Sequence, residues 1–396
     1  MIRKTLSGVR NGNEWILLTV SFAWLLGLGV RLIYPAVLPF IRTEYGMGLT
    51  MAGAVLTLLW LGYGLMQFPG GLLADRVGER NVLVGSIAIA IAGVSLVVLA
   101  PAVEAFFAGT LLVGIGVGLY GTTRVTVLVD VYPRHAGTAM GINQAAGNVG
   151  TSVLPALAGV LATSLSWRWG FGLLIPLFAV TIVGLWITVP EVTSTESASE
   201  PLSRASLVRA ARAVGQRSTG YATVSMLLIS FVYQSFTGFY PTYLVLEKSF
   251  SESQAATFLG VFFASGILVQ PLAGALSDAI GPQRTLGGFL SVVVVCLVGL
   301  PWIDGTAPLL VLSVLASSLL SFWPVANAYV VQTVDDAHQG TTVGVVRTIY
   351  LTLATTGPIF AGALADRDMF DSVFLILAGV TLLAAVVCLA YPSLDD

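Results

Sequence analysis

Charged residues are scarce in this sequence of 396 residues. Asp, Glu, Lys and Arg make up 10% of it, whereas soluble domains carry roughly 25%. Hydrophobic residues make up 56%, and the mean hydropathy is +0.90. This composition excludes an ordinary soluble domain and indicates a protein of the lipid bilayer. The 18 basic and 20 acidic side chains almost balance, so no basic face is available for nucleic acid, and we expect no such partner.

Residues that hold metals or perform catalysis are also few. The two cysteines, Cys296 and Cys388, lie inside apolar runs, as small buried side chains do, rather than in a disulfide or metal site. The sequence has no phosphate-binding loop, zinc-type histidine pair or Gly-x-Ser-x-Gly elbow. The glycine pattern of residues 116–121 matches a dinucleotide-binding fingerprint, but it lies in an apolar run with no strand before it. We therefore predict no cofactor, no metal and no enzymatic activity.

Long apolar runs are what the sequence does contain. A helix that crosses a bilayer needs about 20 mostly apolar residues, and we find twelve such runs. They lie near residues 15–40, 51–73, 81–100, 104–130, 138–164, 168–189, 218–246, 252–277, 284–303, 306–333, 341–364 and 370–391. The predicted fold is an all-α membrane protein of twelve transmembrane helices. Eleven basic residues fall on the side of both termini and four on the other, which predicts cytoplasmic termini in the cell membrane.

The sequence also repeats itself at an offset of 203 residues, which predicts two pseudo-symmetric six-helix bundles. The repeat covers four runs of each half. Matched residues include Gln67 with Gln270, Gly71 with Gly274, Asp75 with Asp278, Gly78 with Gly281, His135 with His338 and Pro155 with Pro358. The one long hydrophilic stretch divides the halves, so we expect an N-terminal half over 1–189, a cytoplasmic linker over 190–217 and a C-terminal half over 218–396.

The loop between the second and third runs carries a recognisable motif. From Gly71 to Arg80 it reads Gly-Leu-Leu-Ala-Asp-Arg-Val-Gly-Glu-Arg, which resembles the cytoplasmic loop signature of the major facilitator superfamily. The stretch from Gly274 to Arg284 is a degenerate second copy. The sixth run, which opens Trp-Arg-Trp-Gly-Phe at Trp167, resembles the family as well. The resemblance covers the whole chain and implies a secondary transporter that works by alternating access.

The same resemblance implies a conformational latch. In the family, the aspartate of the signature faces the N-terminus of the eleventh helix and closes the cytoplasmic side. A helix N-terminus favours a nearby negative charge by roughly 0.3–1 kcal/mol. The alternative is that Asp75 and Arg76 only cap their own helices. The residues assigned to the latch are Gly71, Asp75, Arg76, Gly78, Arg80, Asp130, Asp278 and Arg347.

Three arginines, Arg31, Arg124 and Arg347, lie within apolar runs. Each would cost roughly 2.5–3.5 kcal/mol at the centre of a helix in lipid, so each must face water, a partner or a substrate. Arg31 lies deep in the first run, with Trp24 and Tyr34 on the same helical face, which favours a substrate cavity.

The other two buried arginines have competing interpretations. Arg124 could contact substrate or form an ion pair with Asp130 or Asp75. Arg347 lies about six residues into its run, which favours a gating or structural role over the alternative of substrate binding. Gln144 belongs to a polar stripe that could bind substrate or join helices.

The first run resembles one branch of the family more than others. Arg31, followed by Tyr-Pro and then Pro39, resembles the first span of organic-anion and organophosphate symporters. Phosphate-ester members carry a second arginine where this chain has Tyr233, which argues against a phosphorylated substrate. Basic residues of many relatives are replaced by Thr110 and Glu79, so the charge relay must differ.

The substrate class follows from the charges inside the runs. No Asp or Glu lies deep in any run, whereas exporters of cationic drugs generally need an intramembrane carboxylate. Buried arginine without acid predicts a small organic anion such as a carboxylate. We expect a monomeric symporter, and coupling, if any, would be to a proton or a cation. The predicted substrate site is lined by Arg31, Tyr34, Tyr120, Arg124, Gln144, Tyr233, Gln234, Trp323 and Asn327.

Two alternatives stay open at this point. An exporter of drugs or hydrophobic metabolites with the same fold is favoured by the Gly/Pro-rich fifth and eleventh runs, and proton-dependent efflux of a cation would support it. A membrane receptor or enzyme that transports nothing would bind ligand without flux.

Overall fold

The computed structural model describes residues 13–133, 135–191, 216–333 and 339–391, without the side chains of 75, 217–218, 331–333 and 339–343. Every regular element in these ranges is helical. They contain twelve helical segments long and apolar enough to cross a membrane. The predicted all-α fold with twelve transmembrane helices is thus confirmed for the described part of the chain.

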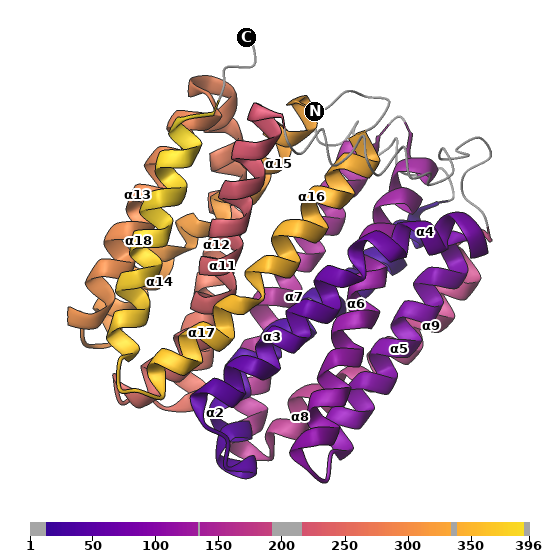
Figure 1. Ribbon diagram of the computed structural model, residues 1–396. Coiled ribbons are helices and arrows are strands. Elements are labelled where there is room, and N and C mark those ends of the chain that lie inside the picture. Colours follow the sequence, from indigo (N-terminus) through magenta and orange to yellow (C-terminus); the bar gives the residue numbers. More distant parts are fainter. Residues whose placement is uncertain (1–12, 134, 192–215, 334–338, 392–396) are drawn as a thin grey trace. The chain divides into compact units, whose positions relative to one another are not determined.

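Several spans consist of two consecutive helices (Figure 1). The helices of the first repeat are α2 (Glu14–Tyr45), α3 (Leu49–Leu65), α4 (Gln67–Val77), α5 (Glu79–Leu99), α6 (Val103–Val131), α7 (Ala136–Ser164), α8 (Trp167–Gly172) and α9 (Leu174–Thr188). Those of the second are α11 (Arg217–Leu246), α12 (Glu252–Ile280), α13 (Pro282–Gly299), η1 (Leu300–Trp302), α14 (Thr306–Ala316), η2 (Ser317–Ser321), α15 (Phe322–Thr333), α16 (Gln339–Ala354), α17 (Thr356–Ala365) and α18 (Phe370–Leu389).

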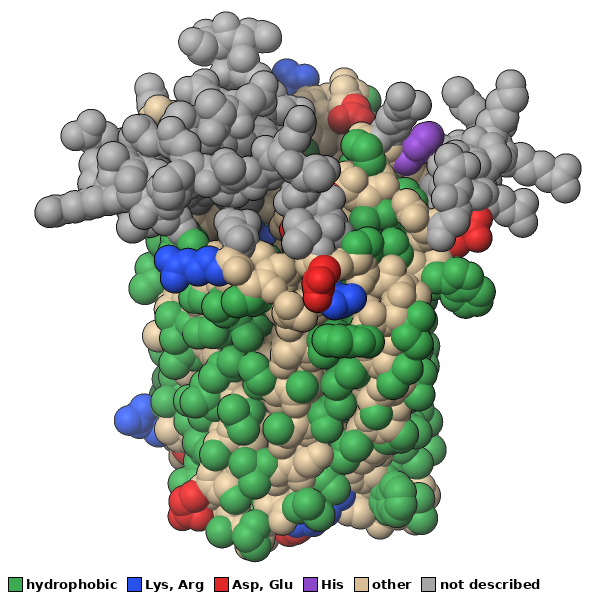
Figure 2. All heavy atoms as spheres, turned by 90° about the vertical axis from the view of Figure 1, so that its right-hand side faces the viewer, with side chains coloured by type: hydrophobic (Ala, Val, Ile, Leu, Met, Phe, Trp, Pro, Cys, Tyr) green, Lys and Arg blue, Asp and Glu red, His purple; other side chains and the backbone are tan. Residues whose placement is uncertain are grey.

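The outer faces of these helices are apolar. On α9, Val180, Val183, Trp186 and Ile187 are all more than half exposed. Figure 2 shows hydrophobic side chains over the middle of the visible face, with charged side chains toward its two ends. Soluble proteins rarely expose so much contiguous apolar surface, whereas helices that face lipid do.

Contacts within the chain divide it into two compact units. One consists of Met1–Ile33 and Leu58–Pro201, and the other of Tyr34–Thr57 and Leu202–Asp396. The units differ from the predicted halves by residues 34–57, because the end of α2 and the start of α3 pack with helices of the second repeat. The division at 190–217 stays a prediction, because 192–215 are outside the described residues.

Two matched turns show the repeat in the backbone. Gly78, between α4 and α5, has φ +85°, and Gly281, between α12 and α13, has φ +87°. The two glycines are 203 residues apart, and positive φ is a conformation that glycine adopts without steric cost. A Cβ at position 78 would also lie 2.6 Å from the carbonyl oxygen of Glu191. The repeated glycines are therefore required by the same turn.

In the first unit, glycines let helices touch through their backbones. A Cβ added to Gly150 of α7 would lie 2.1 Å from the carbonyl oxygen of Leu25 in α2. One added to Gly114 of α6 would lie 2.3 Å from the carbonyl oxygen of Leu59 in α3. Such close approach increases dispersion contact, which is the main source of helix association in lipid.

In the second unit, the first half of α3 packs on α17. The Thr57 hydroxyl donates a hydrogen bond to the carbonyl oxygen of Thr355, at 2.6 Å. A Cβ at Gly53 would lie 2.4 Å from the carbonyl oxygen of Pro358, and one at Gly362 would lie 2.1 Å from that of Leu49. A segment of the first repeat is thus in backbone contact with a helix of the second.

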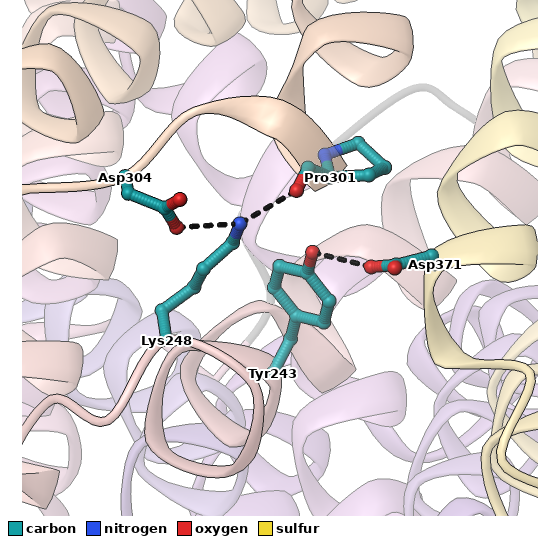
Figure 3. Close-up of polar contacts among 5 residues, drawn as sticks. All are labelled: Tyr243, Lys248, Pro301, Asp304 and Asp371. Carbon is teal, nitrogen blue, oxygen red and sulfur yellow. Dashed lines mark hydrogen bonds and ion pairs between the residues drawn. The ribbon is translucent and has the colours of Figure 1, made fainter.

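Two further polar contacts lie in the second unit (Figure 3). Lys248, just after α11, donates to the carboxylate of Asp304 at 2.9 Å and to the carbonyl oxygen of Pro301 at 2.7 Å. The Tyr243 hydroxyl of α11 donates to the carboxylate of Asp371 in α18 at 2.6 Å. Both contacts join elements of the second repeat to one another.

Candidate functional site

Arg31 lies in the middle of α2, where it is only 6% exposed. Its guanidinium carbon is 4.1 Å from the centre of the Tyr63 ring and 4.8 Å from that of Trp60, both on α3. Trp60 and Tyr63 are three residues apart, so they lie on one face of that helix. Aromatic faces attract a cation by about 0.5–2 kcal/mol, which keeps the side chain in place but supplies no negative charge.

The Arg31 guanidinium forms no hydrogen bond or ion pair with any residue that the structure describes, and its Nε is buried. Pro35 follows four residues later inside α2, so the Arg31 carbonyl also lacks its usual intrahelical donor. A permanently charged fork with five N–H donors is therefore held among aromatic rings, with no acceptor from the part of the chain that the structure describes. This arrangement suits the reversible binding of an anion with two oxygen atoms.

Arg124 of α6 has a different environment in the same unit. Its guanidinium carbon lies 3.6 Å from the centre of the Trp24 ring, and one terminal nitrogen donates to the side-chain oxygen of Asn143 in α7. The Asn143 amide in turn lies 3.3 Å from the Ser21 hydroxyl. Arg124 therefore links α6 to α2 and α7. Whether it also contacts substrate, Asp130 or Asp75, as the sequence suggested, stays a prediction.

Tyr120 extends the Arg124 cluster. Its ring stacks on Trp24 at a centroid distance of 6.5 Å, and its hydroxyl donates to the carbonyl oxygen of Val20 at 2.8 Å. Gly147 of α7 makes room for the indole, because a Cβ there would lie 2.7 Å from the Trp24 ring nitrogen. The predicted face of Tyr120 and Arg124 is thus largely engaged by protein.

Trp60, Tyr63 and Asn143 were not among the site residues predicted from the sequence. Asn143 could have been found, because it precedes Gly147, Gly150 and Leu154 at helical spacing and all four are buried. A polar residue on a small-residue face is expected to contact a neighbouring helix. The predicted residue was the adjacent Gln144, which is exposed and donates to the side-chain oxygen of Asn148 at 3.2 Å. One residue corresponds to about 100° of helix rotation.

In the second unit, the predicted aromatic residues meet. Tyr233 of α11 lies edge to face with Trp323 of α15, at a centroid distance of 6.0 Å, and with Phe263 of α12 at 6.3 Å. Trp323 stacks on Tyr350 of α16 at 6.0 Å. Four helices of this unit thus contribute one aromatic cluster, two members of which were not predicted.

Gln234 directly follows Tyr233 of this cluster in α11, and its side chain is only 1% exposed. Neither its amide nitrogen nor its amide oxygen has a hydrogen-bond partner among the described residues, and the same holds for the hydroxyls of Ser230 and Ser235. Buried polar groups are usually paired. Of the remaining predicted site residues, Tyr34 is fully buried in α2, and Asn327 is exposed and donates to the Trp323 carbonyl at 2.7 Å.

The residues predicted to form the latch have varied surroundings. The side chain of Asp75 is outside the described part of the chain, so its proposed partner helix is untested. Arg80 forms an ion pair with Glu191 at 2.7 Å and lies over the Trp186 ring, 4.5 Å from its centre. Arg76 and Asp278 are exposed, Gly71 has open space at its Cβ position, and Gly78, Asp130 and Arg347 are half-buried.

Comparisons with known proteins agree with this architecture. A family model described as Major Facilitator Superfamily matches residues 19–322 and again 250–395. The chain is 21% identical to the hexuronate transporter of Bacillus subtilis, over 89% of this chain and 88% of that protein. It is 24% identical to the multidrug resistance protein MdtG of Citrobacter koseri, over 93% of each.

A solved structure is also similar in fold. The inward-facing, unoccupied structure of a bacterial homologue of the human lysosomal transporter Spinster superposes with a TM-score of 0.79. The match covers 96% of this chain and 97% of that one, at 16% identity. At this identity, the likeness concerns the fold alone.

Proposed function

Because the chain belongs to the major facilitator superfamily, a family of transporters rather than enzymes, we propose that it moves a small organic anion, such as a carboxylate, by secondary active transport. Arg31 would bind the anion, and the protein would expose it to each side of the membrane in turn. The observation that carries the proposal is the Arg31 guanidinium, buried against Trp60 and Tyr63 with no acceptor among the described residues.

Arg31 is more suitable for this role than Arg124, the other buried arginine of the first unit. Arg124 already has Asn143 and Trp24 as partners, so an anion would have to compete with protein contacts there. Moving a charged side chain from water into a protein interior costs on the order of several kcal/mol when no partner compensates the charge. An anion bound at Arg31 would offset that cost, so anion binding there would be favoured.

The distribution of acids supports an anion over a cation. In the described spans, acidic side chains lie near helix ends, as Glu79, Glu104, Asp130 and Asp371 do. Within these described spans, no carboxylate is therefore placed to bind a cationic drug in mid-membrane. The named substrate of the Bacillus subtilis relative, a hexuronate, carries a carboxylate, which is consistent with the proposed class. Symport with a proton would follow if the substrate carboxylate itself carries the proton.

A binding screen on the purified protein tests the proposal. We expect small carboxylates to raise the melting temperature and neutral or cationic compounds of similar size to leave it unchanged, because only the former pair with Arg31. Flux into proteoliposomes would then be measured for each hit at two pH values. Stabilisation and proton-driven efflux of hydrophobic cations, without a response to any carboxylate, would overturn the anion proposal.

The proposed topology gives a separate prediction. Single cysteines replacing Ser199, in the predicted linker, and Ser393, near the C-terminus, are expected to react with a membrane-impermeant maleimide only from the cytoplasm. A cysteine at Glu104, at the start of α6, should react only from outside, because the basic loops are expected to stay in the cytoplasm. Intact cells and inverted vesicles provide the two measurements. The reverse labelling pattern would contradict the orientation.

The proposed cytoplasmic latch is tested by Asp75→Asn. This change removes the charge that a helix N-terminus would bind and hardly alters side-chain size. We expect a larger cytoplasm-open population in spin-label distance distributions, together with slower transport. Normal distances and transport in Asp75→Asn would mean that Asp75 only caps its own helix.

A further inference from the structure

The first turn of α3 is capped by a residue more than 300 positions away. The backbone N–H of Leu49 donates to one carboxylate oxygen of Asp366 at 2.7 Å, and the backbone N–H of Thr50 donates to the other at 2.7 Å. The Thr50 hydroxyl donates to the same second oxygen at 2.6 Å. Asp366 directly follows α17, so a side chain of the second repeat satisfies the orphan N–H groups of a helix of the first.

The carboxylate of Asp366 is well suited to this position. Partial burial would raise its pKa, but the hydrogen bonds from Thr50 and Leu49 and the charge of Arg42 outweigh burial, so the pKa lies below its ordinary value. The group is therefore ionised at neutral pH, when its negative charge faces the positive end of the α3 dipole. The contact combines a helix cap with a charge interaction.

The two repeats cap their corresponding helices differently. The corresponding helix of the second repeat, α12, is capped by its own residues: Ser251 accepts from the N–H of Gln254, whose side chain accepts from the N–H of Ser251. The positions 203 residues earlier are Gly48 and Met51, whose side chains cannot accept these bonds. A local cap in one repeat thus takes the place of a distant one in the other.

Gly48 also leaves the space that Asp366 needs. A Cβ at position 48 would lie 3.1 Å and 3.4 Å from the two carboxylate oxygens, which is tighter than ordinary contact. Nearby acids behave differently, because Asp371 and Asp304 bond Tyr243 and Lys248 of their own repeat (Figure 3). Among these three acids, Asp366 is the one that joins the second repeat to the first.

We infer that Asp366 is a releasable latch on the side of the membrane predicted to be extracellular. Its bonds to Leu49 and Thr50 hold the start of α3 against α17 while that side is closed, and they break when it opens. This inference rests on the proposed alternating-access transport but not on the proposed substrate. It assigns to the outer side a charge-to-helix contact of the kind predicted at Asp75 for the cytoplasmic side.

Spin-label distances test the latch without any substrate. Labels at Glu104→Cys and Ala307→Cys, two exposed positions that correspond in the repeats, would be placed in a Cys296→Ala/Cys388→Ala background. Asp366→Asn removes the charge and one acceptor, and we expect it to raise the outer-open to outer-closed ratio roughly 3- to 30-fold, as loss of a helix cap permits. Asp371→Asn, the matched control five residues along, should leave the ratio unchanged.

A second variant separates a latch from a simple helix cap. Gly48→Ser/Met51→Gln supplies α3 with the self-cap of α12, and Asp366→Ala in that background removes the distant cap and vacates the space. We expect normal folded yield, because α3 is capped, but a persistently raised outer-open population. Return of the closed distribution, or an unchanged distribution in Asp366→Asn, would overturn the inference. These distances are measured without ligand, so the result does not depend on the outcome of the anion screen.

Discussion

Replacing Arg31 with glutamine is expected to abolish anion binding almost completely while leaving the protein folded. The guanidinium is buried on two aromatic rings and bonds no described residue, so a bound carboxylate would be its main ionic partner. Removing one member of a buried, hydrogen-bonded charge pair costs about 2–5 kcal/mol, which corresponds to a loss of affinity of roughly 30-fold or more. Isothermal titration of the purified variant with a carboxylate identified by the screen measures this loss.

Arg31→Lys distinguishes geometry from charge. Lysine keeps the positive charge but offers a mobile point charge instead of a planar fork that can hold both oxygens of a carboxylate. We expect an affinity between those of the native protein and Arg31→Gln. If charge alone mattered, Arg31→Lys would bind as the native protein does.

Arg124→Gln is the matched control for Arg31→Gln, because it removes a second buried arginine of the same unit. Its guanidinium bonds Asn143 and lies on Trp24, so its loss should lower the melting temperature and change anion affinity less. If Arg124→Gln lost anion affinity and Arg31→Gln kept it, the anion site would lie at Arg124. Full affinity in Arg31→Gln, together with lower stability, would show that Arg31 is structural.

Replacing Gly150 with valine is expected to prevent the first unit from folding normally. A Cβ at this position would lie 2.1 Å from the carbonyl oxygen and 2.8 Å from the carbonyl carbon of Leu25, and backbone atoms cannot rotate away as side chains can. Overpacked cores lose about 1–3 kcal/mol, occasionally more. Separating α2 from α7 should reach at least the upper end of that range. Folded yield by fluorescence size-exclusion chromatography and the melting temperature report the effect.

Gly141→Val is the control for this change. Gly141 lies in the same helix, nine residues earlier, and a Cβ there would meet nothing within 4 Å. Both substitutions alter helix propensity equally, so the difference between them isolates the contact with α2. Equal yield and melting temperature for the two variants would contradict the close approach of α2 and α7.

Much of the fold could be predicted because its signals are local. Each transmembrane helix is a continuous apolar run whose length is set by the bilayer, and the structure places helices at all twelve predicted positions. The glycines at 78 and 281 were recognised as repeat mates, and both have the positive φ that their turns require. Neither feature depends on how one helix packs against another.

The candidate site was only partly predictable, because it depends on helix rotation and on neighbours far apart in sequence. Gln144 was predicted in place of Asn143, and the two side chains point about 100° apart around α7. The residue that bonds Arg124 was therefore not predicted. Likewise, Trp60 and Tyr63 resembled ordinary apolar residues of α3 until the structure placed them on Arg31.

The sequence by itself determined the twelve spans, the repeat and the three arginines in apolar surroundings, because hydropathy, turn chemistry and the cost of a buried charge can be read residue by residue. Only the tertiary structure decided which arginine bonds a protein side chain, Arg124 with Asn143, and which has no hydrogen-bond or ion-pair partner among the described residues, Arg31. It also decided that Asp366 caps α3. Each of these contacts joins helices that are distant in the chain, and their rotation and packing, rather than any local pattern, bring the atoms within bonding distance.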